Sequence, residues 1–252
     1  MRLNIILISF ILLLNGCQSF SSLNRENQME LYPSKNITIK NQVDWQIKLY
    51  HNRITDFKKR PIGFKKIVFL GNSITEGGKS WNKRFNLRNL VNRGISGDIT
   101  EGVLVRLNEI YYYKPLAVFL LIGINDIFDS NIKNREKITP KYVANNILKI
   151  AENIQKISKY TKVYIQTVLP VDLIKYKKMK GNAPSHTVDL NEQINQINSL
   201  IKLSQSNPNI KVIDLHKNFV NEDGIIHNDL SSDGVHLTEE GYQTWIEVIK
   251  PE

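Results

Sequence analysis

The stretch that decides the fold is residues 67–76, Ile67-Val68-Phe69-Leu70-Gly71-Asn72-Ser73-Ile74-Thr75-Glu76. Four consecutive apolar residues predict a buried strand, and Gly71 with Asn72 supplies the turn that ends it. In an open α/β sheet the carboxyl ends of the strands border the ligand crevice, so a hydroxyl group placed there is well sited for chemistry. Ser73 is therefore the first candidate functional residue, although a serine in this place is also a common N-cap of the next helix.

The same alternation of strand and helix continues along the chain. Further strands are predicted at 90–93, 117–122, 163–169 and 211–215. Apolar residues at three- and four-residue steps predict helices over 43–57, 98–107, 139–157, 190–201 and 242–249. This order predicts a parallel sheet with helices on both faces. The expected fold class is α/β, a flavodoxin-like three-layer α/β/α sandwich with a five-stranded sheet.

Two aspartates are expected to have structural roles. Asp98-Ile99-Thr100-Glu101 has the spacing of a capping box at the start of a helix. Asp126 follows a predicted strand in Gly123-Ile124-Asn125-Asp126. We expect Asp98 and Asp126 to cap helices or to brace loops.

The N-terminus carries an export pattern. Arg2 precedes an almost wholly apolar run over residues 3–14, which is too short to span a bilayer, so residues 1–16 are predicted to be a signal peptide. Leu14-Asn15-Gly16-Cys17 resembles a bacterial lipobox, in which the cysteine is lipidated; a cleaved signal with an incidental cysteine is the alternative. Cys17 is the only cysteine in the chain, so no intramolecular disulfide competes for it, which favours lipidation.

The remaining chain is predicted to be a tether followed by one domain. Residues 17–42 form the expected lipidated tether, and ordered structure is expected over 43–252, a length that suits one α/β domain. We therefore expect an exported lipoprotein anchored to a membrane through Cys17. Gln18, which is not the aspartate that marks retention in the inner membrane of some bacteria, favours the outer membrane.

The formal net charge of +10 does not indicate a nucleic-acid partner. The lysines are scattered, and the one dense cluster lacks an aromatic series for base stacking. That cluster, Lys175, Lys177, Lys178 and Lys180, lies in the segment 172–188, which is predicted to be a flap beside a pocket. With His186, its lysines are expected to favour an anionic substrate. The positive charge otherwise serves solvation, or affinity for acidic glycans or lipid head groups.

Residues that acyl transfer requires follow the predicted strands. Ser73 supplies a nucleophile, His236 a base, and Asp233, three residues before it, a carboxylate that orients the imidazole. The backbone N–H groups of Ser73 and Gly94 and the side-chain amide of Asn125 are candidate oxyanion donors. His51, His186, His216 and His227 lack the paired spacing of a metal site and stay unassigned, so no metal or other cofactor is expected.

Four blocks of this sequence resemble, in order and spacing, those of the SGNH/GDSL esterase family. They are Gly71-Asn72-Ser73-Ile74, Asn92-Arg93-Gly94-Ile95-Ser96-Gly97-Asp98, Gly123-Ile124-Asn125-Asp126 and Asp233-Gly234-Val235-His236. Within the family the chain looks most like platelet-activating-factor acetylhydrolase subunits and bacterial sialate O-acetylesterase-like proteins. The one departure is Asn72, where many members have aspartate; this position is outside the triad.

The resemblance implies the SGNH hydrolase sandwich, no metal, and hydrolysis of small acyl esters, acetyl above all. It implies Ser73, Asp233 and His236 as the triad, and Ser73, Gly94 and Asn125 as the oxyanion hole. The expected substrate is a small acylated molecule, an acetylated sugar or glycan first. The alternatives are a lysophospholipase or thioesterase on the same scaffold, and a catalytically idle surface binding lipoprotein.

Overall fold

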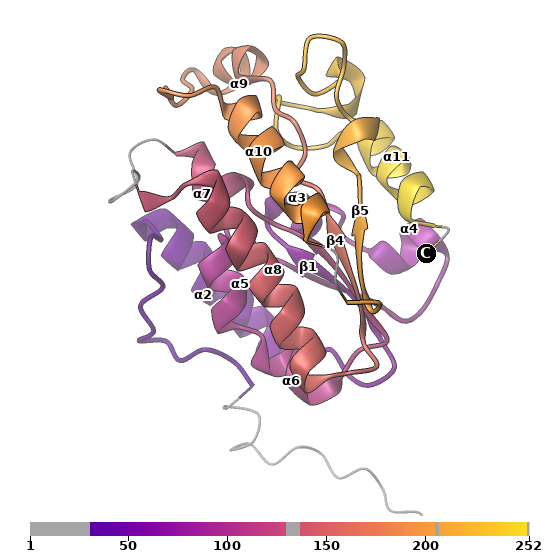
Figure 1. Cartoon of the computed structure of the whole chain (residues 1–252). Helices are drawn as coiled ribbons and strands as arrows, with labels where there is room; N and C mark the ends of the chain where they lie inside the picture. Colours follow the sequence, from indigo (N-terminus) through magenta and orange to yellow (C-terminus); the bar gives the residue numbers. More distant parts are fainter. Residues whose placement is uncertain (1–30, 130–136, 205–206, 251) are drawn as a thin grey trace, which may run out of the picture.

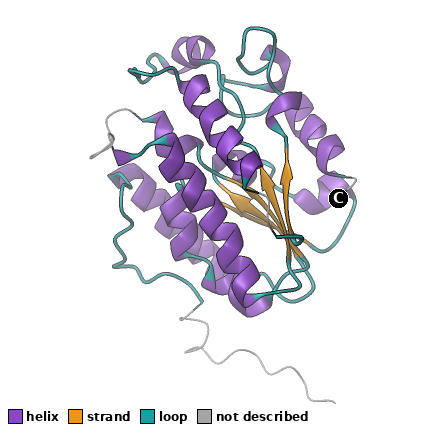
Figure 2. Cartoon of the chain, in the orientation of Figure 1, coloured by secondary structure: helices purple, strands orange, loops and turns teal. Residues whose placement is uncertain are grey.

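The computed structural model describes residues 31–129, 137–204, 207–250 and 252. Its centre is an all-parallel, five-stranded sheet in the order β2-β1-β3-β4-β5, with helices on both faces (Figures 1 and 2). The strands are β1 (Ile67–Gly71), β2 (Leu90–Gly94), β3 (Ala117–Leu121), β4 (Lys162–Gln166) and β5 (Ile210–Ile213). The predicted fold class is confirmed.

The helices of the described residues connect these strands. Those before β3 are α2 (Asp44–Lys59), α3 (Ser73–Gly77), α4 (Trp81–Phe85), α5 (Thr100–Val105) and α6 (Asn108–Tyr113). Those after it are α7 (Ile124–Phe128), α8 (Pro140–Ile157), α9 (Leu173–Lys180), α10 (Leu190–Leu203) and α11 (Glu239–Ile249), with the short 3₁₀ helices η2 (His216–Asn218) and η3 (Asn228–Leu230). Among the described residues no helix is long and apolar enough to cross a membrane.

Aromatic side chains cover one face of the sheet, beneath α4 and α11. Phe69 stacks on Phe119 of the neighbouring strand, with ring centroids 5.2 Å apart. Trp81 of α4 stacks on Phe69 at 4.0 Å, and Trp245 of α11 meets Trp81 edge to face at 4.9 Å. These rings are buried, so stacking of large apolar surfaces holds both helices against the sheet.

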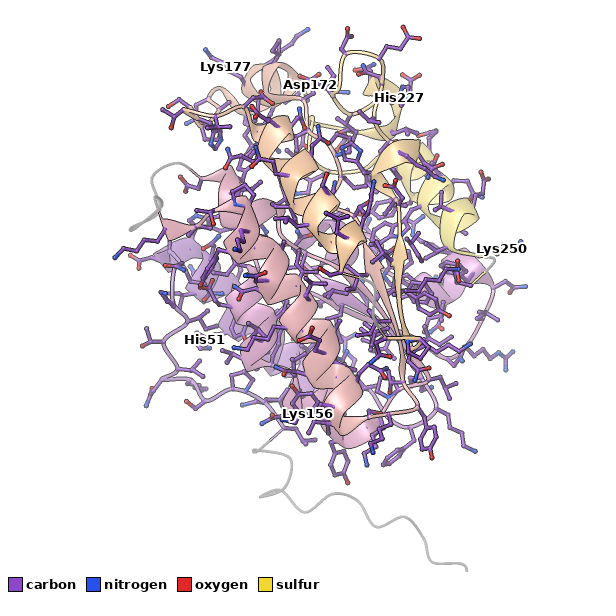
Figure 3. All side chains as sticks on the ribbon, in the orientation of Figure 1. His51, Lys156, Asp172, Lys177, His227 and Lys250 are labelled. Carbon is purple, nitrogen blue, oxygen red and sulfur yellow. The ribbon has the colours of Figure 1, made fainter. Side chains whose placement is uncertain are left out.

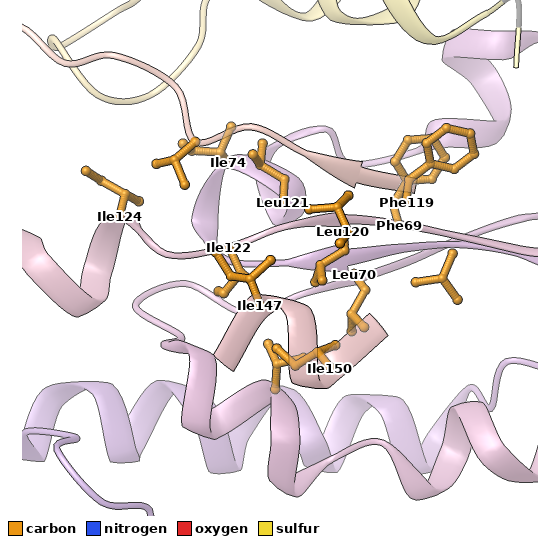
Figure 4. Packing of buried hydrophobic residues seen from close by; sticks show 14 of the residues in the cluster. Phe69, Leu70, Ile74, Phe119, Leu120, Leu121, Ile122, Ile124, Ile147 and Ile150 are labelled. Carbon is orange, nitrogen blue, oxygen red and sulfur yellow. The ribbon is translucent and has the colours of Figure 1, made fainter. Parts of the chain in front are cut away.

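Aliphatic side chains cover the other face. Leu70 and Leu120 lie on the side of the sheet that faces α8, where Ile147 and Ile150 pack against them (Figure 4). Residues 117–121 are all buried, as a nearly continuous apolar run predicts for a strand that is covered on both faces. Both faces of the sheet are thus covered. The carboxyl ends of the strands form its open end, which we call the rim.

Two predicted strands are shorter than expected. β4 ends at Gln166, because beyond it the N–H and C=O groups of Val168 bond to the side chain of Asn198 in α10. β5 ends at Ile213, where Leu215 turns back to donate to the Ile213 carbonyl. Burial of Val168 and Leu215 in loops accounts for the apolar pattern that predicted longer strands.

The part of the expected tether that the structure describes belongs to the core. Leu31, Tyr32 and Ile39 are buried, and the Tyr32 hydroxyl donates to Glu109 Oε1 at 2.7 Å. The prediction that ordered structure begins at residue 43 is therefore too late by about a dozen residues, because three spaced apolar side chains suffice to pin an irregular segment. The predicted signal peptide, Cys17 and residues 17–30 lie outside the described residues.

Two threonines cap long helices, whereas the predicted capping box is absent. Thr139 and Thr238 cap α8 and α11 with their hydroxyl groups. The Asp98–Glu101 capping box does not form: α5 begins after Ile99, which makes no side-chain cap. Asp98 is instead paired with Arg106 at 2.9 Å, and Glu101 binds Asn41 and Tyr142.

Candidate active site

Ser73 stands at the first position of α3, directly after β1. The N-cap of α3 is Asn72, whose side-chain oxygen accepts the N–H of Ile74 at 3.0 Å. The hydroxyl group of Ser73 is therefore not used as a cap. A Cβ on Gly71 would lie 2.2 Å from the Leu121 carbonyl oxygen, so glycine allows the tight exit from the strand that presents Ser73 at the rim.

The structure brings Ser73, His236 and Asp233 into one chain of hydrogen bonds. His236 Nε2 lies 3.0 Å from Ser73 Oγ, and His236 Nδ1 lies 2.9 Å from Asp233 Oδ2. The other carboxylate oxygen of Asp233 accepts the backbone N–H groups of Val235 at 3.1 Å and His236 at 2.8 Å. With Nδ1–H donating to the carboxylate, Nε2 is left to accept the Ser73 hydroxyl proton.

The environment of Asp233 keeps its carboxylate ionised. Burial acts to raise the pKa of Asp233, but the hydrogen bonds from His236, its backbone N–H and Lys180 together hold the pKa well below its usual range. Lys180 Nζ lies 3.1 Å from Asp233 Oδ2. A negative charge is thus maintained beside the imidazole at neutral pH.

The segment 172–188, predicted to be a flap, contains the helix α9, which supports the loop that carries His236. Asp172 N–H donates to the Gly234 carbonyl at 2.8 Å, and Asp172 caps α9. Lys175 Nζ donates to Asn228 and to the Ser231 carbonyl at 2.7–2.9 Å. In Figure 3 Asp172 lies at the same end of the molecule as His227, beside this loop.

This arrangement corrects part of the predicted role of the basic cluster. Lys175 is bound to three acceptors of the 228–231 turn, so its charge is not free for substrate. Lys180 faces Asp233. Lys177 and Lys178 are exposed, and Figure 3 shows Lys177 at the outer surface of α9.

A pocket of about 460 Å³ opens above Ser73 and His236. Its aromatic and apolar wall consists of Trp45, Phe128, Tyr176, Pro184 and Val235, and its polar wall of Gln46, Ser96, Gly97, Asn125 and Asp129. Trp45, at the amino end of α2, is 52% exposed, which makes it a broad apolar surface at the mouth of the pocket. No sequence pattern distinguished Trp45 from the other residues at the start of that helix.

Asn125 lies where the sequence predicts it, in the first turn of α7 and in the wall of this pocket. One of its amide N–H bonds is donated to the Asp98 carbonyl at 2.9 Å, which fixes the orientation of the side chain. An amide carries two N–H bonds, and among the described residues only this one has an acceptor, so the second is available to a ligand. The backbone N–H of Ser73, at the start of α3, has no partner within that helix.

Gly94 is not placed as an oxyanion donor. Its N–H donates to Asn92 Oδ1 at 2.9 Å, and its residue does not line the Ser73 pocket. A Cβ there would lie 2.2 Å from Glu76 N and 2.8 Å from the Asn72 carbonyl oxygen. Glycine at this position therefore lets α3 pack against β2, which is a structural reason for it.

Gly97, and not Gly94, is the glycine of this block that lines the pocket. It lines the pocket together with Ser73 and Asn125, in a left-handed conformation with φ of +78°. A Cβ on Gly97 would meet the ring of Trp45 at 2.4 Å. The block Asn92–Asp98 holds two glycines, and only the turn geometry distinguishes the one that borders the pocket.

Buried carboxyl groups brace the loop that carries Gly97. Asp126 accepts the Thr100 N–H at 3.1 Å and also binds the Thr100 hydroxyl. A side chain of α7 thus supplies the hydrogen-bond acceptor for the first N–H of α5. Burial raises the pKa of Asp126 to about 8 and that of Asp98 to about 6. The expectation that Asp98 and Asp126 brace loops is confirmed.

The remaining histidines do not join the site. His51 makes an edge contact with Tyr50, and His216 is partly buried in η2, where burial lowers its pKa. His186 and His227 are not among the pocket-lining residues. Within the described part of the chain, no three His, Cys, Asp or Glu side chains cluster in an arrangement that would hold a metal ion.

Comparison with known proteins identifies the family. A sequence profile of the GDSL-like Lipase/Acylhydrolase family matches residues 69–244. Platelet-activating factor acetylhydrolase IB subunit alpha2 of Homo sapiens is 30% identical over 201 residues, which cover 76% of this chain and 76% of that protein. Subunit alpha1 of Rattus norvegicus is 27% identical over 201 residues, which cover 77% of this chain and 76% of that protein.

Solved structures agree with this assignment. A GDSL-like lipase from Bacteroides thetaiotaomicron has a TM-score of 0.64 at 25% sequence identity. The matched region covers 80% of this chain and 95% of the chain of that lipase. An acetylxylan esterase from Geobacillus stearothermophilus shares the fold, with a TM-score of 0.57 at 17% identity over 75% of this chain and 94% of its own. The chain belongs to the GDSL-like lipase/acylhydrolase family and is a carboxylic ester hydrolase.

Proposed function

We propose that this protein hydrolyses short-chain esters, acetyl esters of carbohydrates above all, through an acyl intermediate on Ser73. The observation that carries the proposal is the hydrogen-bond chain from Ser73 Oγ to His236 Nε2, 3.0 Å, and from His236 Nδ1 to Asp233, 2.9 Å. A nucleophile, a base and an orienting carboxylate in this order are the parts that acyl transfer requires. The geometry argues against a catalytically idle binding protein, which has no need of such a chain.

The first half of the reaction forms the acyl enzyme. Ser73 Oγ attacks the ester carbonyl carbon while His236 Nε2 takes the hydroxyl proton, and the carbonyl electrons move to oxygen. Asp233 stabilises the imidazolium without taking its proton. Collapse of the tetrahedral intermediate breaks the bond to the leaving alcohol, which receives the proton from His236.

The negative charge on the tetrahedral intermediate is stabilised by N–H groups at the rim. The donors are the backbone N–H groups of Ser73 and Gly97 and the free N–H of Asn125. These donors are held before the substrate arrives, Asn125 by its bond to the Asp98 carbonyl, so little reorganisation is needed at the transition state.

The second half releases the acid. A water molecule, deprotonated by His236, attacks the carbonyl carbon of acyl-Ser73. The second tetrahedral intermediate, stabilised by the same donors, then collapses, and the proton returns from His236 to Ser73 Oγ. The products are the free alcohol and acetate, and no cofactor enters the scheme.

Two features support an acetylated sugar as substrate. Trp45, 52% exposed at the mouth of a partly polar pocket, presents a flat surface on which the apolar face of a sugar ring packs. Relatives in this family are named acetylhydrolases, and the neighbour from Geobacillus stearothermophilus is named an acetylxylan esterase. The alternative is a lysophospholipase or thioesterase activity. The dependence of hydrolysis on acyl chain length distinguishes it from acetylesterase activity.

We also propose that the protein acts at a membrane surface. The apolar residues 3–14 and the lipobox-like Leu14-Asn15-Gly16-Cys17 support export and lipidation of Cys17. Acyl chains on Cys17 hold the hydrolase domain at the bilayer, with residues between the anchor and Leu31 as the tether. Labelling of cells with a radioactive or clickable fatty acid, with Cys17→Ser as the control, tests this.

The test of the enzymatic proposal is hydrolysis of p-nitrophenyl acetate, butyrate and octanoate by the purified protein. The proposal predicts the highest kcat/KM for acetate, a fall beyond butyrate, and a loss of about 10³-fold or more in Ser73→Ala. Ser199→Ala, which removes an exposed hydroxyl group on α10, is the matched control and retains full activity.

The chain-length series separates the alternatives. A preference for octanoate over acetate contradicts the acetylesterase proposal and supports a lipase-like or thioesterase activity on the same triad. Activity that survives in Ser73→Ala contradicts the assigned nucleophile. Release of acetate from acetylated xylan and from O-acetylated sialic acid then identifies the alcohol.

A further inference from the structure

A second cavity, larger than the Ser73 pocket, runs along the outer edge of the sheet. Its volume is about 880 Å³, against about 460 Å³ for the pocket over Ser73. The cavity lies beside the edge strand β2, between the carboxyl end of α2 and the segment from α3 to α4. We call it the β2 groove; its polar lining is Arg53, Asp56, Arg60, Lys66, Glu76, Lys79, Ser80, Asn82, Arg88, Asn92 and Arg93.

The β2 groove carries an excess of positive charge. Six of its lining residues are lysine or arginine and two are acidic. Arg93 is buried and paired with Glu109 at 2.8 Å, and Arg53 pairs with Glu76 at 3.3 Å. In the described part of the chain the other four cations, Arg60, Lys66, Lys79 and Arg88, form no ion pair.

These four cations come from different parts of the fold. Arg60 and Lys66 lie on either side of the turn that leads from α2 into β1, and Lys79 and Arg88 flank α4. They are spread over almost thirty residues of sequence, so no run of basic residues predicts that they come together. The six cations of the groove outnumber its two carboxylates, so the like charges repel one another, and an anion bound among them relieves this repulsion.

The shape and the aromatic content of the groove restrict the kind of anion. A concave cavity admits a chain and excludes a flat bilayer surface. Its aromatic residues are not available for base stacking, because Phe57 is 3% exposed and Trp81 is 1% exposed. Arg53 and Arg93 lie over the Phe57 ring at 5.0 and 4.4 Å. Guanidinium and ammonium groups without a stacking surface suit carboxylates on a sugar chain better than nucleotides.

The β2 groove and the Ser73 pocket share a wall. Arg53 in the groove pairs with Glu76. The other oxygen of Glu76 accepts both the N–H and the hydroxyl of Ser96, each at 2.7 Å, and Ser96 lines the Ser73 pocket. A chain that lies in the groove therefore passes on the far side of a single side-chain layer from the pocket.

We propose that the β2 groove binds a segment of acidic polysaccharide, whose carboxylates pair with Arg60, Lys66, Lys79 and Arg88. The binding does not depend on the hydrolysis proposed at Ser73, because no residue of the hydrogen-bond chain lines the groove. It concentrates the protein on an anionic glycan and places the Ser73 pocket beside that chain.

The experiment measures binding of a fluorescein-labelled oligogalacturonate to the full chain by fluorescence anisotropy at low and at physiological salt. The groove variant is Arg60→Gln, Lys66→Gln, Lys79→Gln and Arg88→Gln together. The matched control removes four exposed lysines on and after α8, by Lys141→Gln, Lys149→Gln, Lys156→Gln and Lys159→Gln. Figure 3 marks one of them, Lys156, at the outer surface of α8.

The proposal predicts that the groove variant weakens binding by about tenfold or more and flattens its salt dependence, while the control of equal charge changes binding about twofold at most. A neutral oligosaccharide of the same length does not bind. Hydrolysis of p-nitrophenyl acetate by the groove variant stays at the wild-type level, which confirms its fold. If the fourfold variant does not fold, Arg60→Glu with Arg88→Glu, two exposed positions, replaces it.

Three results overturn the proposal. One is absence of oligogalacturonate binding by the wild-type chain at low salt, and another is equal weakening by the groove and control variants. The third is a groove variant that loses binding to phosphatidylglycerol vesicles and keeps binding to oligogalacturonate, which assigns the groove to a membrane. None of these results bears on ester hydrolysis, so the two proposals fail separately.

Discussion

Lys180 Nζ lies 3.1 Å from Asp233 Oδ2, the same oxygen that accepts His236 Nδ1. The carboxylate that orients the imidazole is thus shared with a cation from α9. The hydrogen bond from Lys180 is one of the interactions that hold the pKa of Asp233 below its usual range. The side chain of Lys180 is 47% exposed, so solvent screens part of the effect.

Removal of Lys180 should weaken the support of the Asp233 carboxylate. Lys180→Met removes one of the donors that hold this carboxylate, so kcat/KM falls by a small factor, about twofold to threefold. Lys178→Met, which removes an exposed charge from the same helix, leaves kcat/KM unchanged. Equal kcat/KM values for the two variants would mean that Lys180 does not support the pair of Asp233 and His236.

Alanine substitutions at the two glycines of the Asn92–Asp98 block should affect different properties, stability at Gly94 and kcat at Gly97. In Gly94→Ala the new methyl group meets the backbone at Glu76, so the free energy of unfolding falls by several kcal/mol, about 2–4. In Gly97→Ala the methyl group meets the movable ring of Trp45 beside the pocket and the φ of +78° adds about 1–2 kcal/mol of backbone strain, so kcat falls while the free energy of unfolding falls less than in Gly94→Ala. Urea denaturation and kcat, measured on both variants, check this; a stable Gly94→Ala with low kcat contradicts it.

The buried carboxyl of Asp126 predicts a loss of stability with rising pH. Its pKa is raised to about 8 in the folded chain from 3.8, so the folded state holds a proton that the unfolded state releases. The stabilisation is complete below pH 4 and is lost as the pH rises toward 8.

This dependence is measured by urea denaturation at pH 5 and pH 8. Wild type should lose at least about 1 kcal/mol more than Asp126→Asn between these values, since asparagine does not titrate. Asp98, whose pKa is raised in the same direction, contributes equally to both proteins. An equal loss in the two proteins would contradict the assignment to Asp126.

Lys175 should act on the His236 loop and not on substrate charge. Lys175→Met removes three hydrogen bonds to the 228–231 turn, so kcat falls by a similar factor for neutral and anionic acetyl esters. Lys177→Met, an exposed position on the same helix, serves as the control. A selective rise in KM for the anionic ester in Lys175→Met would restore the specificity role predicted from the sequence.

Much of the fold follows from local patterns in the sequence. The apolar runs at 67–70 and 117–121 locate the central strands, and the apolar steps over 139–157 locate α8, because burial of both faces of a strand or of one face of a helix has a signature in the local sequence. The ends of β4 and β5 do not follow. Asn198, thirty residues away in sequence, replaces the strand partners of Val168, and no local pattern records such a contact.

Some residues of the site follow from the sequence and others only from the fold. Ser73, Asn125, Asp233 and His236 are predicted by residue type and order: Ser73 and Asn125 come soon after strands, and Asp233 and His236 lie in the loop before the last helix. The choice between Gly94 and Gly97 depends on which N–H is already bonded, a property of the folded turn. Lys180 and Trp45 reach the site from helices, and the four free cations of the β2 groove meet only in three dimensions.

The central claim is that Ser73 carries the acyl group, and mass spectrometry of the protein mixed with p-nitrophenyl acetate and quenched with acid tests it most directly. We predict one acetyl group on the peptide that contains Ser73. It should accumulate when Asp233→Asn or His236→Gln slows deacylation more than acylation, and it should be absent in Ser73→Ala. Acetyl transfer to another side chain, or unchanged ester hydrolysis by Ser73→Ala, would contradict the account.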